Sequence, residues 1–172
     1  SMPEPNEEYN EEYIEKLVSQ IAIGAIKFQD LKNNIASGYI FELDDFAKFE
    51  GKTGPYIQYA IARINSILRK SNIECGKVII TNQEERNLAL KIMQLNNIVM
   101  RAHEAKEPSI ISDYAYSLAQ TFSSFYSASS IMNAESSEIA SSRLSLAKLV
   151  RDILTKLLYL LGIEAPEVML KK

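Results

Sequence analysis

The residues best suited to chemistry form a short row of aromatic and cationic side chains. Tyr56, Arg63 and Lys70 are seven positions apart, and Tyr59 follows Tyr56 by three. On an α-helix this spacing places the first three on one face, with Tyr59 one turn above Tyr56. Aromatic rings stack on unpaired bases, and cationic side chains hold phosphates. The row is therefore a candidate contact for single-stranded nucleic acid.

A second interpretation of the same row involves no nucleic acid. Amphipathic side chains often bury their apolar part at the edge of a core and leave the polar end in water. The tyrosines would then close the rim of a helical bundle, and Arg63 would form an internal ion pair. The pattern alone leaves both interpretations open.

The elements that must position this row are helical almost throughout. Apolar residues recur at spacings of three and four, and Pro and Gly stand between the periodic segments. The row flanks one such stripe, which consists of Ile57, Ile61, Ile64 and Leu68. The predicted helices cover about 7–31, Pro55 to about Lys70, a third helix through Leu88, Ile92, Leu95 and Val99, a fourth from Pro108, and a last one ending at Gly162.

Smaller features are expected between these helices. Thr81 and Glu84 have the spacing of a capping box at the start of the third helix. Asp44 is expected to cap a short helical turn within 39–49, and 78–80 is expected to be a short extended piece. The fold class predicted from these patterns is all-α, a helical bundle. Residues 1–40 are interpreted as a leading helix that connects to another domain, and 41–172 as the bundle itself.

Composition limits the class of protein. The 172 residues are 47% hydrophobic and 24% charged, which is typical of a globular domain with a hydrophobic core. No apolar run reaches the roughly 18 residues of a membrane span, and no secretory signal is recognised at the front. The single cysteine, Cys75, excludes an internal disulfide and a cysteine-based metal site. These features favour a cytoplasmic location.

The charge distribution argues against a general nucleic-acid binder. The formal net charge is −3. Residues 1–15 carry six acidic and no basic residues, so the rest of the chain has 19 basic against 16 acidic residues. DNA and membranes are therefore not expected partners, whereas a local RNA contact is compatible with this balance.

Two arginines in the last predicted helix interrupt its apolar stripes. Arg143 and Arg151 are eight positions apart and lie on nearly one face. A partly buried guanidinium group nearly always has a partner. We expect each to pair with an acid such as Asp113 or Glu50.

Two long stretches resemble a known family. The first includes I-G-A-I-K-F-Q-D-L (23–31) and F-E-G-K-T-G-P-Y-I-Q-Y (49–59), and the second includes Y-S-L-A-Q-T-F-S-S-F-Y (116–126) and ends in A-P-E-V-M (165–169). Both are similar to the C-terminal anticodon-binding domain, of the DALR type, of the class I arginyl-tRNA synthetases. In that family the tail usually stops at the methionine, whereas Leu170, Lys171 and Lys172 follow it here.

The resemblance implies a function and a set of site residues. The implied partner is arginine tRNA, bound through its anticodon stem-loop. The residues that the resemblance and the pattern assign to RNA contact are Tyr56, Tyr59, Arg63, Tyr126 and Met169, with possible phosphate contacts at Lys52 and Lys70. The alternative is a helical protein-interaction module that does not read RNA.

Catalysis is expected elsewhere in the parent protein. The family's parent enzyme is an arginine-tRNA ligase that uses ATP and magnesium, and its catalytic domain is the expected second partner on the same polypeptide. The chain contains neither an H-I-G-H-like nor a K-M-S-K-like motif. We therefore expect no catalytic residue, no cofactor and no metal in this chain, and no ligase activity from it alone.

Overall fold

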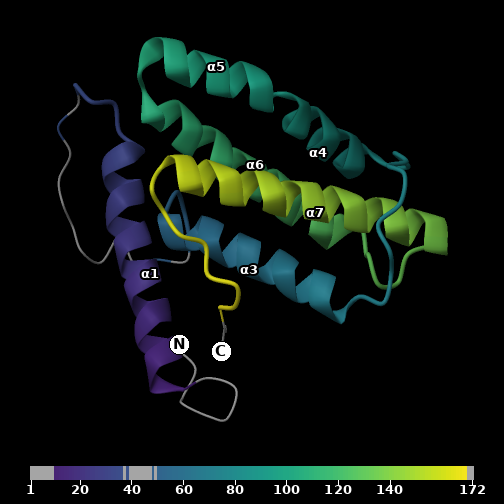
Figure 1. Ribbon diagram of the computed structural model, residues 1–172. Helices are drawn as coiled ribbons and strands as arrows, with labels where there is room; N and C mark the ends of the chain where they lie inside the picture. The colour runs from purple at the N-terminus through teal and green to yellow at the C-terminus, as the bar shows by residue number, and fades with distance from the viewer. Residues whose placement is uncertain (1–9, 37, 39–47, 49, 170–172) are drawn as a thin grey trace.

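The computed structural model describes residues 10–36, 38, 48 and 50–169. These residues form six helices and no strand, so the all-α prediction is confirmed (Figure 1). None of the described helices combines the length and the apolar character needed to cross a membrane. The turn expected around Asp44 lies outside the described residues. The helices are α1 (Glu11–Leu31), α3 (Gly54–Lys70), α4 (Gln83–Met93), α5 (Leu95–Ala105), α6 (Pro108–Ala128) and α7 (Ser137–Leu160).

The start of α3 has the expected residues. Thr53 is the N-cap, and its hydroxyl accepts a hydrogen bond from the Tyr56 N–H at 3.3 Å. Pro55 stands in the first turn, as predicted, where its missing N–H would have had no partner. Ile57, Ile61 and Ile64 are fully buried, which confirms the predicted stripe.

The capping prediction for α4 was wrong by one residue. The N-cap is Asn82, whose side chain accepts from the Glu85 N–H at 2.9 Å. Thr81 instead donates its own N–H to the Glu85 carboxylate at 2.6 Å. The register shifts because Glu85, and not Glu84, is the acid that the tertiary structure buries. Residues 78–80 belong to no helix or strand, and the expected extended piece there stays a prediction.

The predicted third helix is in fact two helices. α4 ends at Met93 and α5 begins at Leu95, with a break at Gln94. The buried Tyr114 of α6 donates its hydroxyl to the Lys91 carbonyl at 2.7 Å, beside the break. Burial raises the pKa of Tyr114 to about 12, so this phenol stays a donor. Because both pieces pack on α6, the break lets them follow its surface (Figure 1).

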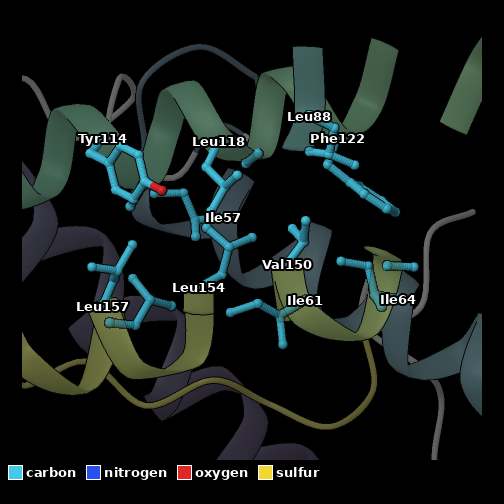
Figure 2. Packing of buried hydrophobic residues seen from close by; sticks show 14 of the residues in the cluster. Ile57, Ile61, Ile64, Leu88, Tyr114, Leu118, Phe122, Val150, Leu154 and Leu157 are labelled. Carbon is cyan, nitrogen blue, oxygen red and sulfur yellow. The ribbon is translucent and has the colours of Figure 1, made fainter. Parts of the chain in front are cut away.

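The core lies where α3, α6 and α7 meet. α3 contributes its isoleucine stripe, α6 contributes Leu118 and Phe122, and α7 contributes Leu154 and Leu157 (Figure 2). α1 adds Phe28, which is fully buried in the same cluster. The leading helix thus packs directly on the bundle. The division of the chain at residue 40 stays a prediction.

α1 crosses α3 at two glycines. A Cβ on Gly54 would lie 2.5 Å from the Gly24 carbonyl oxygen, and a Cβ on Gly24 would lie 2.6 Å from Nε2 of Gln58. A glycine in the interior of a helix costs roughly 1 kcal/mol relative to Ala. Here the missing side chain of Gly54 lets α3 approach the backbone of α1, and the missing side chain of Gly24 leaves room for the Gln58 amide.

The C-terminal tail completes this junction. α7 ends in a Schellman arrangement, with Gly162 at φ 67° and the Ile163 N–H bonded to the Leu158 carbonyl at 2.9 Å. The chain then turns back along α3 (Figure 1). Gln58 donates to the Glu164 carbonyl at 2.8 Å, and Asn65 donates to the Glu167 carbonyl at 3.3 Å.

Arg143 is buried with acid partners other than those expected. Its Nε lies 2.7 Å from Glu85 and its Nη2 lies 3.1 Å from Glu135. Asp113 instead pairs with Lys52, and Arg151 pairs with the adjacent Asp152 at 2.7 Å. The expectation of acid partners was correct, but their identity was wrong because it depends on how the helices cross.

The carboxyl of Glu85 has a shifted pKa. Burial of this group opposes its ionisation, but hydrogen bonds from Thr81 and Arg143 outweigh burial and hold the pKa below its ordinary value. The charged pair is therefore maintained inside the protein.

We predict that Gly54→Ala loosens the junction of α1 and α3. The new methyl group would collide with backbone, which cannot move aside as a flexible side chain can, so the free energy of unfolding should fall by about 1–3 kcal/mol. Gly38→Ala is the matched control, because a Cβ there meets nothing within 4 Å. Equal stabilities of the two variants in urea unfolding would contradict the close crossing.

A second prediction concerns the dependence of stability on pH. The pKa of Glu85 is lower in the folded chain than in the unfolded chain. The stabilisation that ionised Glu85 gives the fold is therefore complete above its pKa in the unfolded chain, about 4.3. That stabilisation is lost as the pH falls through the pKa of Glu85 in the folded chain. Glu85→Gln should lower the free energy of unfolding by about 3–5 kcal/mol at neutral pH, because the buried Arg143 loses its carboxylate partner.

Urea unfolding between acidic and neutral pH measures both effects. Glu85→Gln should flatten the acid part of the stability profile. Glu84→Gln, one position earlier in the same turn, should cost no more than about 1 kcal/mol. Similar losses in the two variants would show that the Glu85–Arg143 pair does not stabilise the fold.

Candidate nucleic-acid interface

Arg63 of α3 and Tyr126 of α6 form the centre of the candidate interface. The guanidinium carbon of Arg63 lies 4.4 Å from the centroid of the Tyr126 ring, which is cation–π geometry. The same ring stacks with Phe122 at 6.0 Å and 28°. Phe122 is buried, Tyr126 is half-buried and Arg63 is exposed. These side chains therefore lead from the core to the surface.

A second aromatic pair joins the same two helices. The rings of Tyr56 and Tyr116 meet edge to face, with centroids 5.4 Å apart. Gln120 donates to the Tyr116 hydroxyl at 3.0 Å. Burial, followed by the proximity of Tyr116, raises the pKa of Tyr56, and the opposing effect of Arg63 is smaller. The Tyr56 phenol is therefore protonated at neutral pH and can donate a hydrogen bond.

The two pairs lie along one line of contact. Tyr56 precedes Arg63 on α3, and Tyr116 precedes Tyr126 on α6, so the two helices run in the same direction where they meet. We call Tyr56, Arg63, Tyr116 and Tyr126 the aromatic seam. Its two ends on α3 are seven residues apart, about 10 Å along the axis. The seam presents aromatic rings and one guanidinium group, all suited to bases and phosphates.

The remaining predicted residues of α3 and its preceding loop differ in their surroundings. Tyr59 is half-buried, and Lys70 is exposed in the last turn of α3. Lys52 pairs with Asp113, so a phosphate there would compete with a carboxylate. Within the described residues no ion pair involves Arg63. Its partner is Tyr126, so the internal ion pair considered from sequence is not observed.

Met169 is not part of the seam. The tail that carries it is bonded to Gln58 and Asn65 of α3. Asn65 is two residues from Arg63, and residues two apart on a helix point in nearly opposite directions. The structure therefore anchors the tail on another side of α3. An RNA contact at the half-buried Met169 stays a prediction.

Sequence reasoning missed Tyr116 and the supporting role of Phe122. Both lie in the stretch that carries the family resemblance, and Tyr116 directly follows the buried Ala115. That position beside a buried stripe was the available signal. The pairing with Tyr56 depends on α3 and α6 being parallel neighbours, which spacing within one helix does not reveal.

A family comparison decides the class of this domain. Residues 57–169 match the family model of the DALR anticodon binding domain. The chain belongs to the DALR anticodon binding domain family. The match includes Arg63 and the two seam tyrosines of α6, while Tyr56 stands one position before it. Among the described residues of this DALR domain, no cluster of three or more His, Cys, Asp or Glu could hold a metal ion.

Curated relatives and solved structures agree with this family. The arginine-tRNA ligase of Maricaulis maris (strain MCS10) is 40% identical over 155 residues, which are 88% of this chain and 26% of that protein. The arginine-tRNA ligase of Lactococcus lactis subsp. cremoris (strain MG1363) is 42% identical over 92% of this chain and 28% of its own length. Thermus thermophilus arginyl-tRNA synthetase superposes with a TM-score of 0.85 at 34% identity, over 91% of this chain and 28% of that one.

These matches confirm the resemblance to arginyl-tRNA synthetases. They also show that the DALR domain chain spans little more than a quarter of the curated relatives it matches. The similarity therefore concerns one part of those proteins.

We predict that Arg63 and Tyr126 are energetically coupled. In a double-mutant cycle of Arg63→Met and Tyr126→Leu, the coupling free energy from urea unfolding should be about 0.5–1 kcal/mol. The exposed pair Lys156 and Tyr159, 5.7 Å apart on α7, is the control and should couple more weakly. Zero coupling between Arg63 and Tyr126 would mean that the stack is not formed in solution.

Proposed function

We propose that this DALR domain binds the anticodon stem-loop of arginine tRNA. It holds that tRNA for ATP-dependent aminoacylation by a catalytic domain of the same polypeptide, in the cytoplasm. ATP and magnesium belong to that catalytic domain, and this chain contributes position and recognition. The observation that carries the proposal is the aromatic seam, with the exposed Arg63 guanidinium stacked on Tyr126.

The seam suits an RNA loop because its groups are already in place. Tyr126 is held by Phe122 on α6 and by Arg63 on α3. A base that stacks on the outer face of the guanidinium extends an existing stack, so few side chains must be ordered on binding. At a rise of about 3.4 Å per stacked nucleotide, the 10 Å between Tyr56 and Arg63 on α3 corresponds to a loop segment of about three bases.

Phosphate contacts are few and local. Arg63 and Lys70 are exposed on α3, whereas Lys52 must exchange Asp113 for phosphate. The chain as a whole has a net charge of −3. Affinity should therefore depend on a small number of cations, and discrimination should come from base contacts such as the donor hydroxyl of Tyr56.

The direct test is a titration with an arginine tRNA anticodon stem-loop and with a stem-loop of scrambled loop sequence, at two salt concentrations. The cognate loop should bind more tightly, and both should weaken as salt rises. Tyr126→Ala should reduce cognate binding by about 1–3 kcal/mol, the range for loss of one base stack. The melting temperature should change little, because Phe122 and Phe125 remain in the core.

Tyr159→Ala is the matched control for this titration. Tyr159 is 73% exposed on α7 and is not part of the seam. Its loss should leave RNA affinity unchanged. Equal binding of cognate and scrambled loops without salt dependence would contradict RNA recognition and favour a module that binds protein.

A further inference from the structure

A basic cavity lies between α3 and α7, which are neighbours in the bundle (Figure 1). Its volume is about 490 Å³, and Asn65, which holds the tail, forms part of its wall. Among the described residues that line it, Arg69, Lys148 and Arg151 are basic, and Glu167 is the one acid. We call Arg69, Lys148 and Arg151 the basic trio. The trio concentrates positive charge in a chain whose net charge is −3.

The basic trio has unused capacity to bind an anion. Among the described residues no ion pair involves Arg69 or Lys148, and both are exposed. Nε of Arg151 lies 2.7 Å from the Asp152 carboxylate, in a geometry that makes no hydrogen bond. A guanidinium group has five N–H donors, and the one hydrogen bond that Arg151 makes within the described part of the chain goes to Asn65 at 3.3 Å. Open donors of this kind suit a phosphate, which accepts two parallel hydrogen bonds from arginine.

The positions of these cations are not explained by the helix dipoles alone. Basic residues in the last turn of a helix offset its dipole, which accounts for Arg69 and Lys70 on α3. Lys148 and Arg151 lie in the middle of α7, away from both ends of its dipole. They are three positions apart, so they share one face of that helix. Two cations from α7 and one from α3 therefore converge on the same cavity.

Positive charge also connects the cavity to the aromatic seam. The 17 residues of α3 include Arg63, Arg69 and Lys70 but no Asp or Glu. Lys70 lies on the face of Arg63, and Arg69 is turned from it by about 100° towards the cavity. A helix with its side chains is about 10–12 Å across. An RNA strand that crosses the C-terminal half of α3 therefore reaches from the seam to the cavity.

We propose that the basic trio binds a backbone phosphate of the RNA whose loop lies on the aromatic seam. The identity of that RNA rests on the proposed function. Every nucleotide carries a phosphate, so the cavity adds affinity and fixes the path of the strand, while the bases on the seam carry the discrimination. The continuity between the cavity and the aromatic rings favours RNA over an acidic segment of a protein.

Variants that remove one charge test the proposal in the titration with the two stem-loops. Arg69→Gln and Lys148→Gln each remove an exposed cation, so neither should disturb the core. Each should weaken the binding of both loops by the same factor, about 5-fold at about 0.1 M salt, and should make the slope of log affinity against log salt shallower by about 0.7. Arg101→Gln is the matched control, because Arg101 is an exposed cation on α5, which packs on α4 and α6.

Cys75 provides a second and local measurement. Its thiol is exposed and lines the same cavity. RNA bound at the basic trio should shield this thiol from iodoacetamide, a neutral reagent, and RNA at ten times its Kd should slow the alkylation roughly 10-fold. Met93→Cys in a Cys75→Ser background is the control thiol. Met93 is 77% exposed on α4 and lies outside the cavity, so the rate there should not change with RNA.

The results separate this proposal from the proposed function. The proposal is overturned, and the proposed function stands, if the cognate loop binds selectively while Arg69→Gln and Lys148→Gln behave like Arg101→Gln and Cys75 stays reactive. If both loops bind equally and both protect Cys75, the basic trio binds RNA phosphate and only the recognition of arginine tRNA fails. Protection of Cys75 by inorganic phosphate but not by RNA would identify a free anion as the ligand and overturn the proposal.

Discussion

The backbone contact between Gly24 of α1 and Gly54 of α3 is the constraint on which the rest of the arrangement depends. No side chain separates the two helices there, so α1 reaches the fully buried Gln58 directly. The Gln58 amide donates to Gln20 of α1 at 3.1 Å and to Glu164 of the tail at 2.8 Å. One side chain thereby fixes three segments that are far apart in the sequence. Because α3 starts at this junction, its position sets where Tyr56 and Arg63 emerge.

The other end of the bundle is held by different chemistry. Arg143 of α7 binds Glu85 of α4, the Ser130 carbonyl and Glu135, so it joins two helices and the loop that precedes α7. Removing one charge of a buried pair destabilises the fold strongly, because the remaining charge is left without a partner. Such a cluster specifies one packing of α4 on α7. It includes the Ser130 carbonyl, four residues after Tyr126 of the seam.

The candidate RNA contact depends on how rigidly α3 is held. The seam between α3 and α6 offers rings and a guanidinium group, which suit bases and phosphates. Gln58 ties α3 to α1 and to the tail, so the helix that carries Tyr56 and Arg63 has a fixed position in the domain. Such preorganisation lowers the cost of ordering these side chains when a ligand binds.

The sequence by itself determined most of the helices and the family that the domain resembles. Periodicity located α1, α3, α6 and α7, because each buries one stripe and local spacing shows that stripe directly. Pro55 and Gly162 marked a helix start and a helix end through their own backbone preferences. The same local spacing placed Tyr56 and Arg63 on one face, and the family match supports the expected class of ligand.

Only the tertiary structure decided the contacts between helices. Tyr126 became the partner of Arg63, and Tyr116 joined Tyr56, because α3 and α6 are parallel neighbours. No proline or glycine marks the break at Gln94 in the sequence. The hydroxyl of Tyr114, on another helix, donates to the Lys91 carbonyl beside the break. The partners of Arg143 and the packing role of Gly24 were hidden for the same physical reason. Spacing along the chain reports which side of a helix a residue occupies, whereas its partner is set by the crossing of helices distant in sequence.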